Sequence, residues 1–590
     1  MRFRLSSPQP QQGRRTLYRL ASKTYPDQTS VDYAYDLAGK VQQVSDPTGT
    51  YSFAYDNMGR LIGTTTQYAF LPGVYSNAYT YDAASNRKSL TGPDGSITTY
   101  GYDTLNRLNG LANSWAGSFG FGYDGLSRRT SLTRPNGVNT SYSYDSLSHL
   151  LSVLHQAGNT VLDGASYTYD AAGNRTSKTN DLNGVTSNYG YDPLYQLTQV
   201  TQGAVTTESY SYDSVGNRMS SSGVLNYTYN ASNELMSNSA GSYTYDNNGN
   251  TLTDAQGRSY AWDFENRLMQ AVVPQTGGGS NAVTFKYDPF GRRIQKNGPL
   301  GTTNYLYDGA DVSDEIDQNG NALAYYAPGP ETDESLSMLR SGATSYYLGD
   351  ALDSTTSLSS SSGTLTNTYT YDSYGRTTAS SGTVTNPYRF AGREFDSETS
   401  IYYNRARYYD ESTGRFLSED PAKFGGGIDF YGYANNNPAI FVDPSGLAPD
   451  CQNCKIDVKC RGIQTKHLGA LGFKHCDAQV TDSNGVTHSL SGGPNGPYNN
   501  STLGGWDTPN PSGSFTGRDI YHNNNANCDT ANCLISHADA YQANTAGWPK
   551  YKYLGGPNSN TWLRDLFGGC GINLHERWYG PPITHIWPLP

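Results

Sequence analysis

The sequence lacks any long apolar run. No stretch approaches the roughly 18 to 20 apolar residues that a membrane span requires. The first 15 residues are polar and basic and contain no apolar core of the kind found in secretory signals. We therefore expect no membrane span, and any export must use a route that does not read a cleavable signal.

Aliphatic content is also low. The residues AVILMFWYC make up only 35% of the 590 positions, whereas glycine occurs 65 times and tyrosine 50 times. This composition argues against a large Leu/Ile/Val core, and the length exceeds that of a single compact domain. We expect two domains or a repeat architecture.

Cysteine is absent before residue 451, and a basic excess is absent throughout. The net charge is −12 up to Asp450 and +1 after it. Neither part has the basic footprint of a nucleic-acid binder, so no nucleic-acid partner is expected. All seven cysteines and seven of the nine histidines lie from Cys451 onward, which marks the tail as a distinct module.

What the sequence does contain is a repeated Tyr-Asp pair followed by a turn, often every 20 to 22 residues. Two degenerate copies, Tyr229-Asn230 and Trp262-Asp263, fill gaps in the series. The tyrosines of the repeat are Tyr35, Tyr55, Tyr81, Tyr102, Tyr123, Tyr144, Tyr169, Tyr191, Tyr212, Tyr245, Tyr287, Tyr307 and Tyr371.

Each unit predicts a β-hairpin. Segments such as 141–145 and 166–170 alternate aromatic with small polar residues, which is typical of a half-buried strand. In the turn that follows, Asp170 can bond nearby backbone N–H groups and Gly173 can take a positive φ. Single hairpins are marginal in water, but stacked hairpins satisfy one another's edges. The repeat therefore predicts a long spiralling sheet in which the Tyr-Asp pairs serve as scaffold; a carbohydrate-binding role is the alternative.

Four further segments carry a family resemblance. They are residues 388–396 (YRFAGREFD), 402–410 (YYNRARYYD), 413–421 (TGRFLSEDP) and the closing segment 437–447 (NPAIFVDPSGL). Together with the repeats they resemble the Rhs/YD-repeat family of polymorphic toxins over roughly residues 30 to 447. The tail after Leu447 is not covered.

The resemblance implies a mainly β protein with four parts. An N-terminal extension (1–30) precedes a cocoon-like shell of YD-repeat hairpins (31–387). A core-associated autoproteolytic segment (388–447) follows, and a small α+β toxin-like domain (448–590) ends the chain. The chain departs from the full family pattern, since it has only about fifteen units and no recognisable N-terminal plug or spike-binding region. The shell is either incomplete or finished by another polypeptide.

The resemblance also implies aspartic self-cleavage between Leu447 and Ala448. Peptide hydrolysis by carboxyl groups needs two of them sharing a proton, and Asp420 and Asp443 both lie in Asp-Pro contexts just upstream of this bond. Arg407 matches the third site position of the family, where a guanidinium can hold a carboxylate ionised or stabilise an oxyanion. The alternative is that both Asp-Pro pairs only cap turns. Asp410 and Asp429 are interpreted as structural.

The tail gives weaker signals. Cys451, Cys454, Cys460 and Cys476 are candidate zinc ligands, but no second CxxC completes the usual spacing, so disulfides are the favoured alternative and no cofactor is expected. His475 and Ser559 faintly resemble the catalytic pair of permuted papain-like hydrolases, although serine stands where cysteine is expected. The structural alternative is that Ser559 caps the N-terminus of a helix. A second possible catalytic group consists of Cys528, Cys533 and His537.

Local patterns in the tail predict a strand pair over 478–490, turning at 482–485, and helices near 533–544 and 561–567. The whole chain then reads as a secreted effector that stays cytoplasmic until a specialised system exports it. The expected partners are its own tail as enclosed cargo, an immunity protein, and secretion machinery or another shell component. The rival from a different class is a non-enzymatic cell-surface adhesion protein with YD repeats.

Overall fold

The computed structural model describes residues 2–5, 19–331, 333–423 and 428–447 of the shell and core, and in the tail 455–462, 474–481, 487–495, 502–506 and 518–523. For residues 2–5 and the tail strands, the backbone alone is described. Within these ranges, no helix is both long enough and apolar enough to cross a membrane.

The described residues up to Ser221 form one sheet of 20 strands in which each strand pairs antiparallel with the next. Its strands are β1 (Arg2–Leu5), β2 (Leu20–Thr24), β3 (Ser30–Tyr35), β4 (Val41–Asp46), β5 (Gly49–Tyr55), β6 (Leu61–Tyr68), β7 (Tyr75–Tyr81), β8 (Arg87–Thr91), β9 (Ile97–Tyr102), β10 (Leu108–Asn113), β11 (Gly117–Tyr123), β12 (Arg129–Thr133), β13 (Val138–Tyr144), β14 (Leu150–Ala157), β15 (Thr160–Tyr169), β16 (Arg175–Asn180), β17 (Thr186–Tyr191), β18 (Leu197–Gln202), β19 (Val205–Tyr212) and β20 (Arg218–Ser221).

A small three-stranded sheet and a sheet of 14 strands continue the same up-and-down pattern. The small sheet contains β21 (Thr228–Tyr229), β22 (Leu235–Asn238) and β23 (Gly241–Ser242). The larger sheet contains β24 (Thr244–Tyr245), β25 (Thr251–Thr253), β26 (Ser259–Trp262), β27 (Leu268–Pro274), β28 (Ser280–Tyr287), β29 (Arg293–Gly298), β30 (Gly301–Asp308), β31 (Asp311–Ile316), β32 (Ala322–Pro328), β33 (Ser335–Arg340), β34 (Ala343–Gly349), β35 (Thr355–Ser360), β36 (Leu365–Tyr371) and β37 (Thr377–Ser381).

The Asp of the repeat holds each turn, as the sequence predicts. Asp170 Oδ1 accepts the backbone N–H groups of Ala172 at 2.9 Å and Asn174 at 2.8 Å, and Gly173 has φ +86°. The degenerate Asn230 accepts N–H groups from its own turn in the same way. Asp side chains that bond the following backbone are the usual means of fixing such turns.

The arginine that ends many turns links each unit to the next. Arg107 Nε donates to Asp103 Oδ2 at 2.7 Å, and its guanidinium lies over the ring of Tyr123, 4.9 Å from the centroid. Tyr123 in turn donates its hydroxyl to the Leu108 carbonyl at 2.8 Å. The same tyrosine bond recurs at Tyr144 and Tyr212. The conserved spacing of the motif within this chain therefore reflects bonds between successive hairpins.

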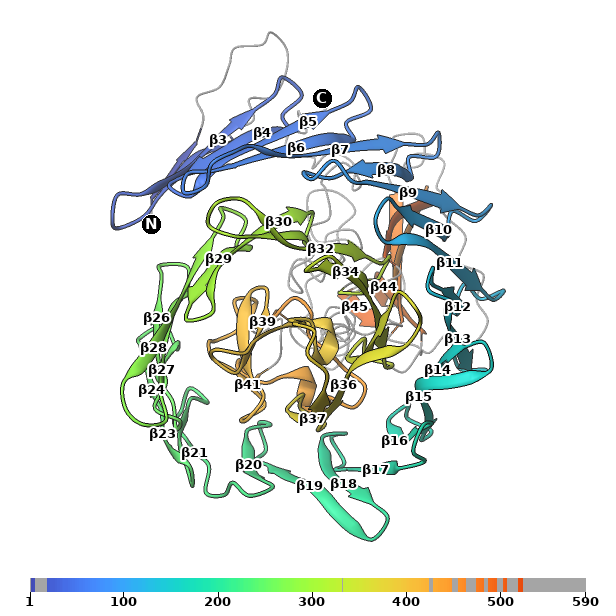
Figure 1. The fold of residues 1–590 in the computed structure, drawn as a ribbon, viewed down its shortest axis with the longest axis vertical. Helices are drawn as coiled ribbons and strands as arrows, with labels where there is room; N and C mark the ends of the chain where they lie inside the picture. Colours follow the sequence, from blue (N-terminus) through green and yellow to red (C-terminus); the bar gives the residue numbers. More distant parts are fainter. Residues whose placement is uncertain are drawn as a thin grey trace.

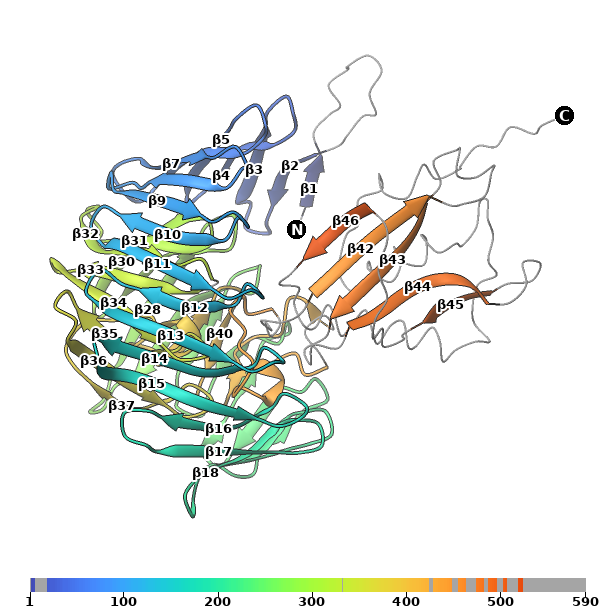
Figure 2. The same cartoon turned by 90° about the vertical axis from the view of Figure 1, so that its right-hand side faces the viewer.

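The sheets wind into a spiral of two turns (Figures 1 and 2). The first turn runs from β3 around to β29, and β30 to β37 then pass inside its first part. Side chains join the two turns over long sequence separations. Tyr68 donates to the Tyr305 carbonyl at 2.7 Å, Tyr346 to the Ala116 carbonyl at 2.9 Å, and Lys178 pairs with Asp350 at 2.7 Å.

The described residues of 388–447 lie at the centre of the spiral (Figure 1). They contain the 3-10 helices η1 (Phe390–Gly392) and η3 (Ala434–Asn436) and a four-stranded sheet of β38 (Glu394–Asp396), β39 (Ile401–Asn404), β40 (Arg407–Asp410) and β41 (Arg415–Phe416). One face, with Tyr402 and Tyr409, packs against Leu197 and Tyr374. The other face, with Tyr408, packs against the β26–β28 wall. This central segment is the core that the walls enclose.

The tail contains a five-stranded sheet in the order β45-β44-β43-β42-β46. Its strands are β42 (Lys455–Gly462), β43 (Lys474–Thr481), β44 (Thr487–Asn495), β45 (Thr502–Trp506) and β46 (Arg518–Asn523). The predicted strand pair is confirmed, since Val480 lies opposite His488 and Thr481 opposite Thr487. The two predicted tail helices lie outside the described residues.

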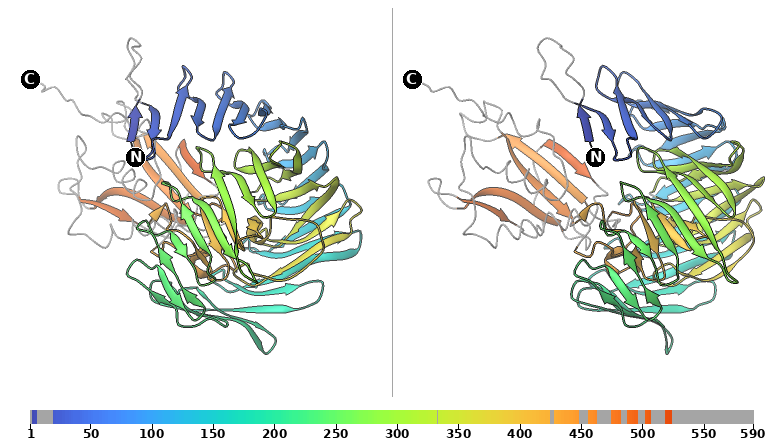
Figure 3. Two further views of the ribbon diagram at one scale, coloured as in Figure 1. Left: turned by 60° about the vertical axis from the view of Figure 1, so that its left-hand side comes forward. Right: turned by 90° about the vertical axis from the view of Figure 1, so that its left-hand side faces the viewer.

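Figures 2 and 3 show these tail strands to one side of the spiral. Enclosure of the tail, which the family resemblance implies, therefore stays a prediction. The mainly β fold and the spiralling hairpin shell are confirmed.

Candidate self-cleavage site

Arg407, the first residue of β40, is the centre of the site. Its side chain is 2% exposed and its Nη2 contacts two carboxyl groups, Asp420 Oδ2 at 3.0 Å and Asp443 Oδ2 at 3.2 Å. Its Nη1 donates to the Phe430 carbonyl at 2.9 Å, and its Nε donates to the Gly446 carbonyl. One guanidinium thus gathers both predicted carboxyls and the backbone just before the predicted cut.

Aromatic packing fixes the position of this guanidinium. The Cζ atom of Arg407 lies 3.6 Å from the centroid of the Phe416 ring. Phe416 pairs across β40–β41 with Tyr409 and also contacts Tyr433, with ring centroids 5.8 Å apart in both cases. A cation held on an aromatic face in a buried site is favoured by both charge and packing.

Asp443 organises the closing loop. Its Oδ1 accepts the backbone N–H groups of Gly446 at 2.8 Å and Leu447 at 3.2 Å. Asn404 Nδ2 donates to the Asp443 carbonyl at 2.8 Å, which ties the loop to the β39–β40 turn. The Asp443 carboxyl group therefore fixes the backbone of residues 446 and 447, which lie three and four residues further along the chain.

Gly446 is required at its position in this loop. Its φ is +69°, a conformation that favours glycine. A Cβ atom there would lie 2.2 Å from the Asn404 carbonyl oxygen and 2.9 Å from the Arg407 nitrogen. Only a residue without a side chain allows the loop to lie this close to the β39–β40 turn.

Asp420 approaches the site from the other side. Its backbone N–H donates to the Phe430 carbonyl at 2.9 Å, and its Oδ1 accepts the Ala422 N–H at 2.7 Å. The side chain is 2% exposed. The second oxygen of this carboxyl is left for Arg407.

Burial dominates the electrostatics of the two carboxyls. Burial raises the pKa of Asp420 to about 6, although Arg407 acts in the opposite direction. Burial likewise raises the pKa of Asp443 above its usual range, again against the effect of Arg407. A single guanidinium compensates only one of two carboxylates, and two interacting carboxyls titrate as a pair. The pair therefore keeps a proton to higher pH than two exposed carboxyls would.

The guanidinium itself stays charged. Burial lowers the pKa of Arg407 from its usual value, and both carboxyls raise it. Arginine nevertheless keeps its proton in proteins, because its unperturbed pKa is so high. The site therefore places a cation and two carboxyls with raised pKa values, all buried, beside one backbone segment.

The neighbouring carboxyls are engaged elsewhere. Asp410 pairs with Arg258 at 2.6 Å, and its Oδ1 accepts the Ser412 N–H at 2.9 Å. Asp429 pairs with Arg415 at 3.1 Å. Neither is paired with Arg407, which agrees with their interpretation as structural residues.

Sequence reasoning missed three residues of this site, Asn404, Phe416 and Tyr433. The Tyr433 side chain is 1% exposed and its hydroxyl has no hydrogen-bond partner in the described part of the chain. Asn404 and Phe416 stand inside the two resemblance segments 402–410 and 413–421. A search of these two segments for polar and aromatic residues on the strands next to Arg407 would have found Asn404 and Phe416.

The tail candidates are placed only in part. Cys460 lies opposite Cys476 in the β42–β43 pair, and His475 lies opposite Arg461. Ala448, Cys451, Cys454 and Ser559 fall outside the described residues, as do Cys528, Cys533 and His537. In the described ranges no group of three His, Cys, Asp or Glu residues is placed to hold a metal ion. The catalytic and metal predictions for the tail are thus untested.

Two family models match the chain. The Teneurin YD-shell model matches residues 166–439, and the RHS Repeat model matches residues 35–69 and 78–118. The matched regions include the walls of both spiral turns and the central segment up to η3. The site residues Arg407 and Asp420 lie within them.

The curated relatives include a protein named as a nuclease and one named as a toxin. The chain is 34% identical over 420 residues to the tRNA3(Ser)-specific nuclease WapA of Bacillus spizizenii, which covers 68% of this chain and 16% of the relative. It is 26% identical over 249 residues to the double-stranded DNA deaminase toxin A of Burkholderia cenocepacia, covering 37% of this chain and 17% of that protein. The chain thus spans about one sixth of the length of these relatives.

Solved structures share the fold. The TcdB2-TccC3-Cdc42 crystal structure matches with a TM-score of 0.63 at 20% identity, over 73% of this chain and 26% of that one. The Photorhabdus luminescens Tc holotoxin pore matches with a TM-score of 0.60 at 19% identity, over 78% and 26%. With the repeats, the closing segment and the family models, these findings lead to one conclusion: the chain belongs to the Rhs/YD-repeat family of polymorphic toxins.

Proposed function

We propose that the central segment cuts its own chain between Leu447 and Ala448 and thereby separates the tail, a toxic effector domain, from the spiral shell. The observation that carries the proposal is Arg407 Nη2 in contact with both Asp420 and Asp443. This arrangement is formed entirely by buried side chains, next to the chain segment to be cut.

In the proposed chemistry the two carboxyls share one proton. The ionised carboxyl takes a proton from a water molecule, whose oxygen attacks the Leu447 carbonyl carbon. The protonated carboxyl then gives its proton to the leaving nitrogen of Ala448. The products are a new carboxyl terminus at Leu447 and a new amino terminus at Ala448.

Arg407 and Asp443 supply positioning. Arg407 keeps one carboxyl ionised and, through its bond to the Gly446 carbonyl, holds the backbone one residue before the bond to be cut. Asp443 Oδ1 fixes the amide of Leu447. A substrate that is part of the same chain and already held in place needs no binding step.

The cleavage proposal is tested by expressing the chain and separating it on a denaturing gel. We expect two fragments, with the smaller one starting at Ala448 by N-terminal sequencing, and a single full-length band for Asp443→Asn. Asp429→Asn is the matched control, because Asp429 is also a carboxyl paired with an arginine of this segment and its side chain is only 9% exposed. A wild-type chain that folds but stays whole would contradict the proposal.

For the effector we propose an enzymatic activity. The support is the names of the relatives, which include tRNA nucleases and a DNA deaminase toxin. The papain-like hydrolase prediction for His475 and Ser559 and the prediction of no nucleic-acid partner both remain open here. Family membership and these names also support an immunity protein, a specialised export route and further shell components as partners.

The effector proposal is tested in growing bacteria. We expect expression of the full chain to arrest growth, and a chain ending at Leu447 to be harmless. Equal growth of both cultures at equal protein levels would rule out a toxic tail in that host. Sequencing of cellular tRNA and DNA after arrest would distinguish a nuclease from a deaminase.

A further inference from the structure

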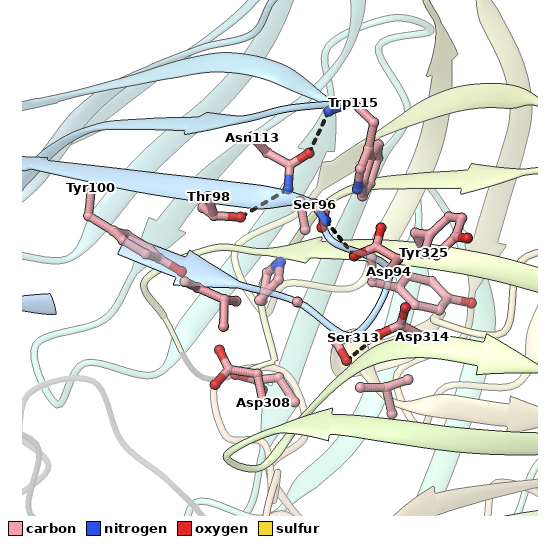
Figure 4. Close-up of a pocket in the computed structure, with 17 residues that line it drawn as sticks. Asp94, Ser96, Thr98, Tyr100, Asn113, Trp115, Asp308, Ser313, Asp314 and Tyr325 are labelled. Atoms are coloured by element: carbon pink, nitrogen blue, oxygen red, sulfur yellow. Dashed lines mark hydrogen bonds between the residues drawn. The ribbon is translucent and has the colours of Figure 1, made fainter. Parts of the chain in front are cut away.

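A small groove lies on the seam between the two turns of the spiral. Residues of β8 to β10 and the turns after β8 and β10 form one wall, and residues of β30 to β32 form the other. Figure 4 labels Asp94, Asp314, Trp115 and Tyr325 among the residues that line it. None of the residues that line the groove is a lysine, arginine or histidine.

At one end of the groove, a guanidinium group of the chain itself already contacts this surface. Arg87 forms an ion pair with Asp308 and lies over the rings of Tyr79 and Tyr100, with Cζ 5.0 Å from each centroid. Asp308 also accepts the Tyr79 hydroxyl at 2.9 Å. A carboxylate beside aromatic faces thus holds a guanidinium belonging to the chain itself.

The other end has the same composition without a cation. Asp94 and Asp314 form no ion pair with any residue in the described part of the chain. Asp94 Oδ1 accepts the Ser96 N–H at 2.9 Å, and Asp314 Oδ2 accepts the Ser313 hydroxyl at 2.5 Å. The Trp115 and Tyr325 rings lie beside them with centroids 6.5 Å apart at 40°.

Asp314 is in an unfavourable environment for a carboxylate. It is 4% exposed, and burial raises its pKa to about 7, with Asp94 acting in the same direction and only the Ser313 hydroxyl against it. Tyr325 is the other titratable group that faces Asp94 and Asp314. A bound cation would stabilise the ionised form of Asp314, whereas an anionic ligand would oppose it.

We propose that this end of the groove, formed by Asp94, Asp314, Trp115 and Tyr325, binds the guanidinium group of an arginine side chain in a peptide ligand. A guanidinium is planar and weakly hydrated, stacks on aromatic rings and donates two parallel hydrogen bonds to a carboxylate. The ammonium group of lysine is compact and strongly hydrated, so it gains less from aromatic rings and from a carboxylate.

The test is calorimetric titration of the full chain carrying Asp443→Asn with the peptide acetyl-Gly-Arg-Gly-amide. The same peptide with citrulline in place of arginine is the control, because citrulline keeps the shape and loses the charge. We expect saturable binding of the arginine peptide and at least tenfold weaker binding of the citrulline peptide. Because the ionised fraction of Asp314 rises about tenfold between pH 6 and pH 8, the affinity for the arginine peptide should rise by up to about tenfold over this range.

Variants distinguish the groove from other surfaces. We expect Asp314→Asn to abolish the pH dependence and to weaken binding at pH 8, and Trp115→Leu to weaken binding at both pH values. Asp32→Asn, an exposed carboxyl on β3, should have no effect. Equal binding of both peptides, or unchanged binding by Asp314→Asn, overturns the proposal, and so does the absence of saturable binding.

Discussion

Arg407 shows how one residue can combine several roles. The same side chain contacts Asp420 and Asp443, lies over the Phe416 ring and donates a hydrogen bond to the Gly446 carbonyl. Sequence reasoning identified the two carboxyls and the arginine from a resemblance, since nothing in their spacing requires them to meet. Their meeting depends on the β39–β40 turn and the closing loop, which bring positions far apart in the segment together.

Gly446 provides a sharp prediction at this scale. We expect Gly446→Ala to reduce self-cleavage by about 100-fold, because the new Cβ would displace the loop from the β39–β40 turn and a shift of about 1 Å at a reacting group costs that much. The measurement is the rate at which the Ala448 fragment appears on a gel.

Gly203→Ala is the control for this prediction. Gly203 also has a positive φ, +60°, but a Cβ there would meet nothing within 4 Å. Both substitutions carry backbone strain, and only that at Gly446 causes the close contact. If both variants cleave at the same rate, the contact with the Asn404 carbonyl is irrelevant to the site.

At the scale of the element, the repeat was readable from sequence because its determinants are local. The Asp that bonds N–H groups two and four residues ahead, and the glycine with positive φ, both follow from residues within one turn. Two links between successive units could not be read. The hydroxyl of Tyr123 bonds the preceding hairpin 15 residues back, and Arg107 lies over the Tyr123 ring 16 residues ahead. These links leave no periodic signal beyond the repeat itself.

Tyr123→Phe tests the link between hairpins. The substitution keeps the ring under Arg107 and removes only the hydroxyl that donates to the Leu108 carbonyl. We expect the free energy of unfolding to fall by about 1 kcal/mol, the usual worth of one such hydrogen bond. Urea denaturation followed by tyrosine fluorescence or circular dichroism measures it.

Tyr195→Phe serves as the comparison, since Tyr195 lies in a turn and is 52% exposed. We expect no measurable change in the urea midpoint for this variant. A loss of the same size at both positions would mean that the hydroxyl of Tyr123 contributes no more than a surface group.

At the scale of the whole molecule, the second turn of the spiral places many carboxyls in buried positions. Burial raises the pKa of Asp353 and of Glu411 to about 8. Asp353 lies in the second turn, and Glu411 lies in the central segment that this turn surrounds. Contacts between residues about 200 positions apart, such as Arg129 with Glu334 and His155 with Gly349, join the second turn to the first. Sequence periodicity carries no information on such contacts, which explains why the seam between the turns was not predicted.

These carboxyls set the dependence of stability on pH. A carboxyl whose pKa is higher in the folded than in the unfolded protein stabilises the fold below the unfolded value near 4, and this stabilisation is lost as the pH rises through the folded value. We therefore expect the Tm to fall between pH 6.5 and pH 8.5. His155, whose pKa burial lowers to about 4, acts in the opposite direction only below pH 6.5.

Calorimetry of the Asp443→Asn chain across this pH range measures the effect without interference from cleavage. The double variant Asp353→Asn, Glu411→Gln should flatten the curve, whereas Asp32→Asn should leave its slope unchanged. A Tm that rises from pH 6.5 to pH 8.5 in the unsubstituted shell would contradict the assignment of neutral, buried carboxyls.

The seam also has a consequence for synthesis on the ribosome. Tyr68 meets its partner Tyr305 only after 237 further residues have been translated. At about 5 to 20 residues per second this delay is on the order of 10 to 50 seconds. During this delay one face of the early hairpins stays exposed to solvent. This face is polar and rich in tyrosine, so the nascent chain stays in solution, whereas an aliphatic face would aggregate.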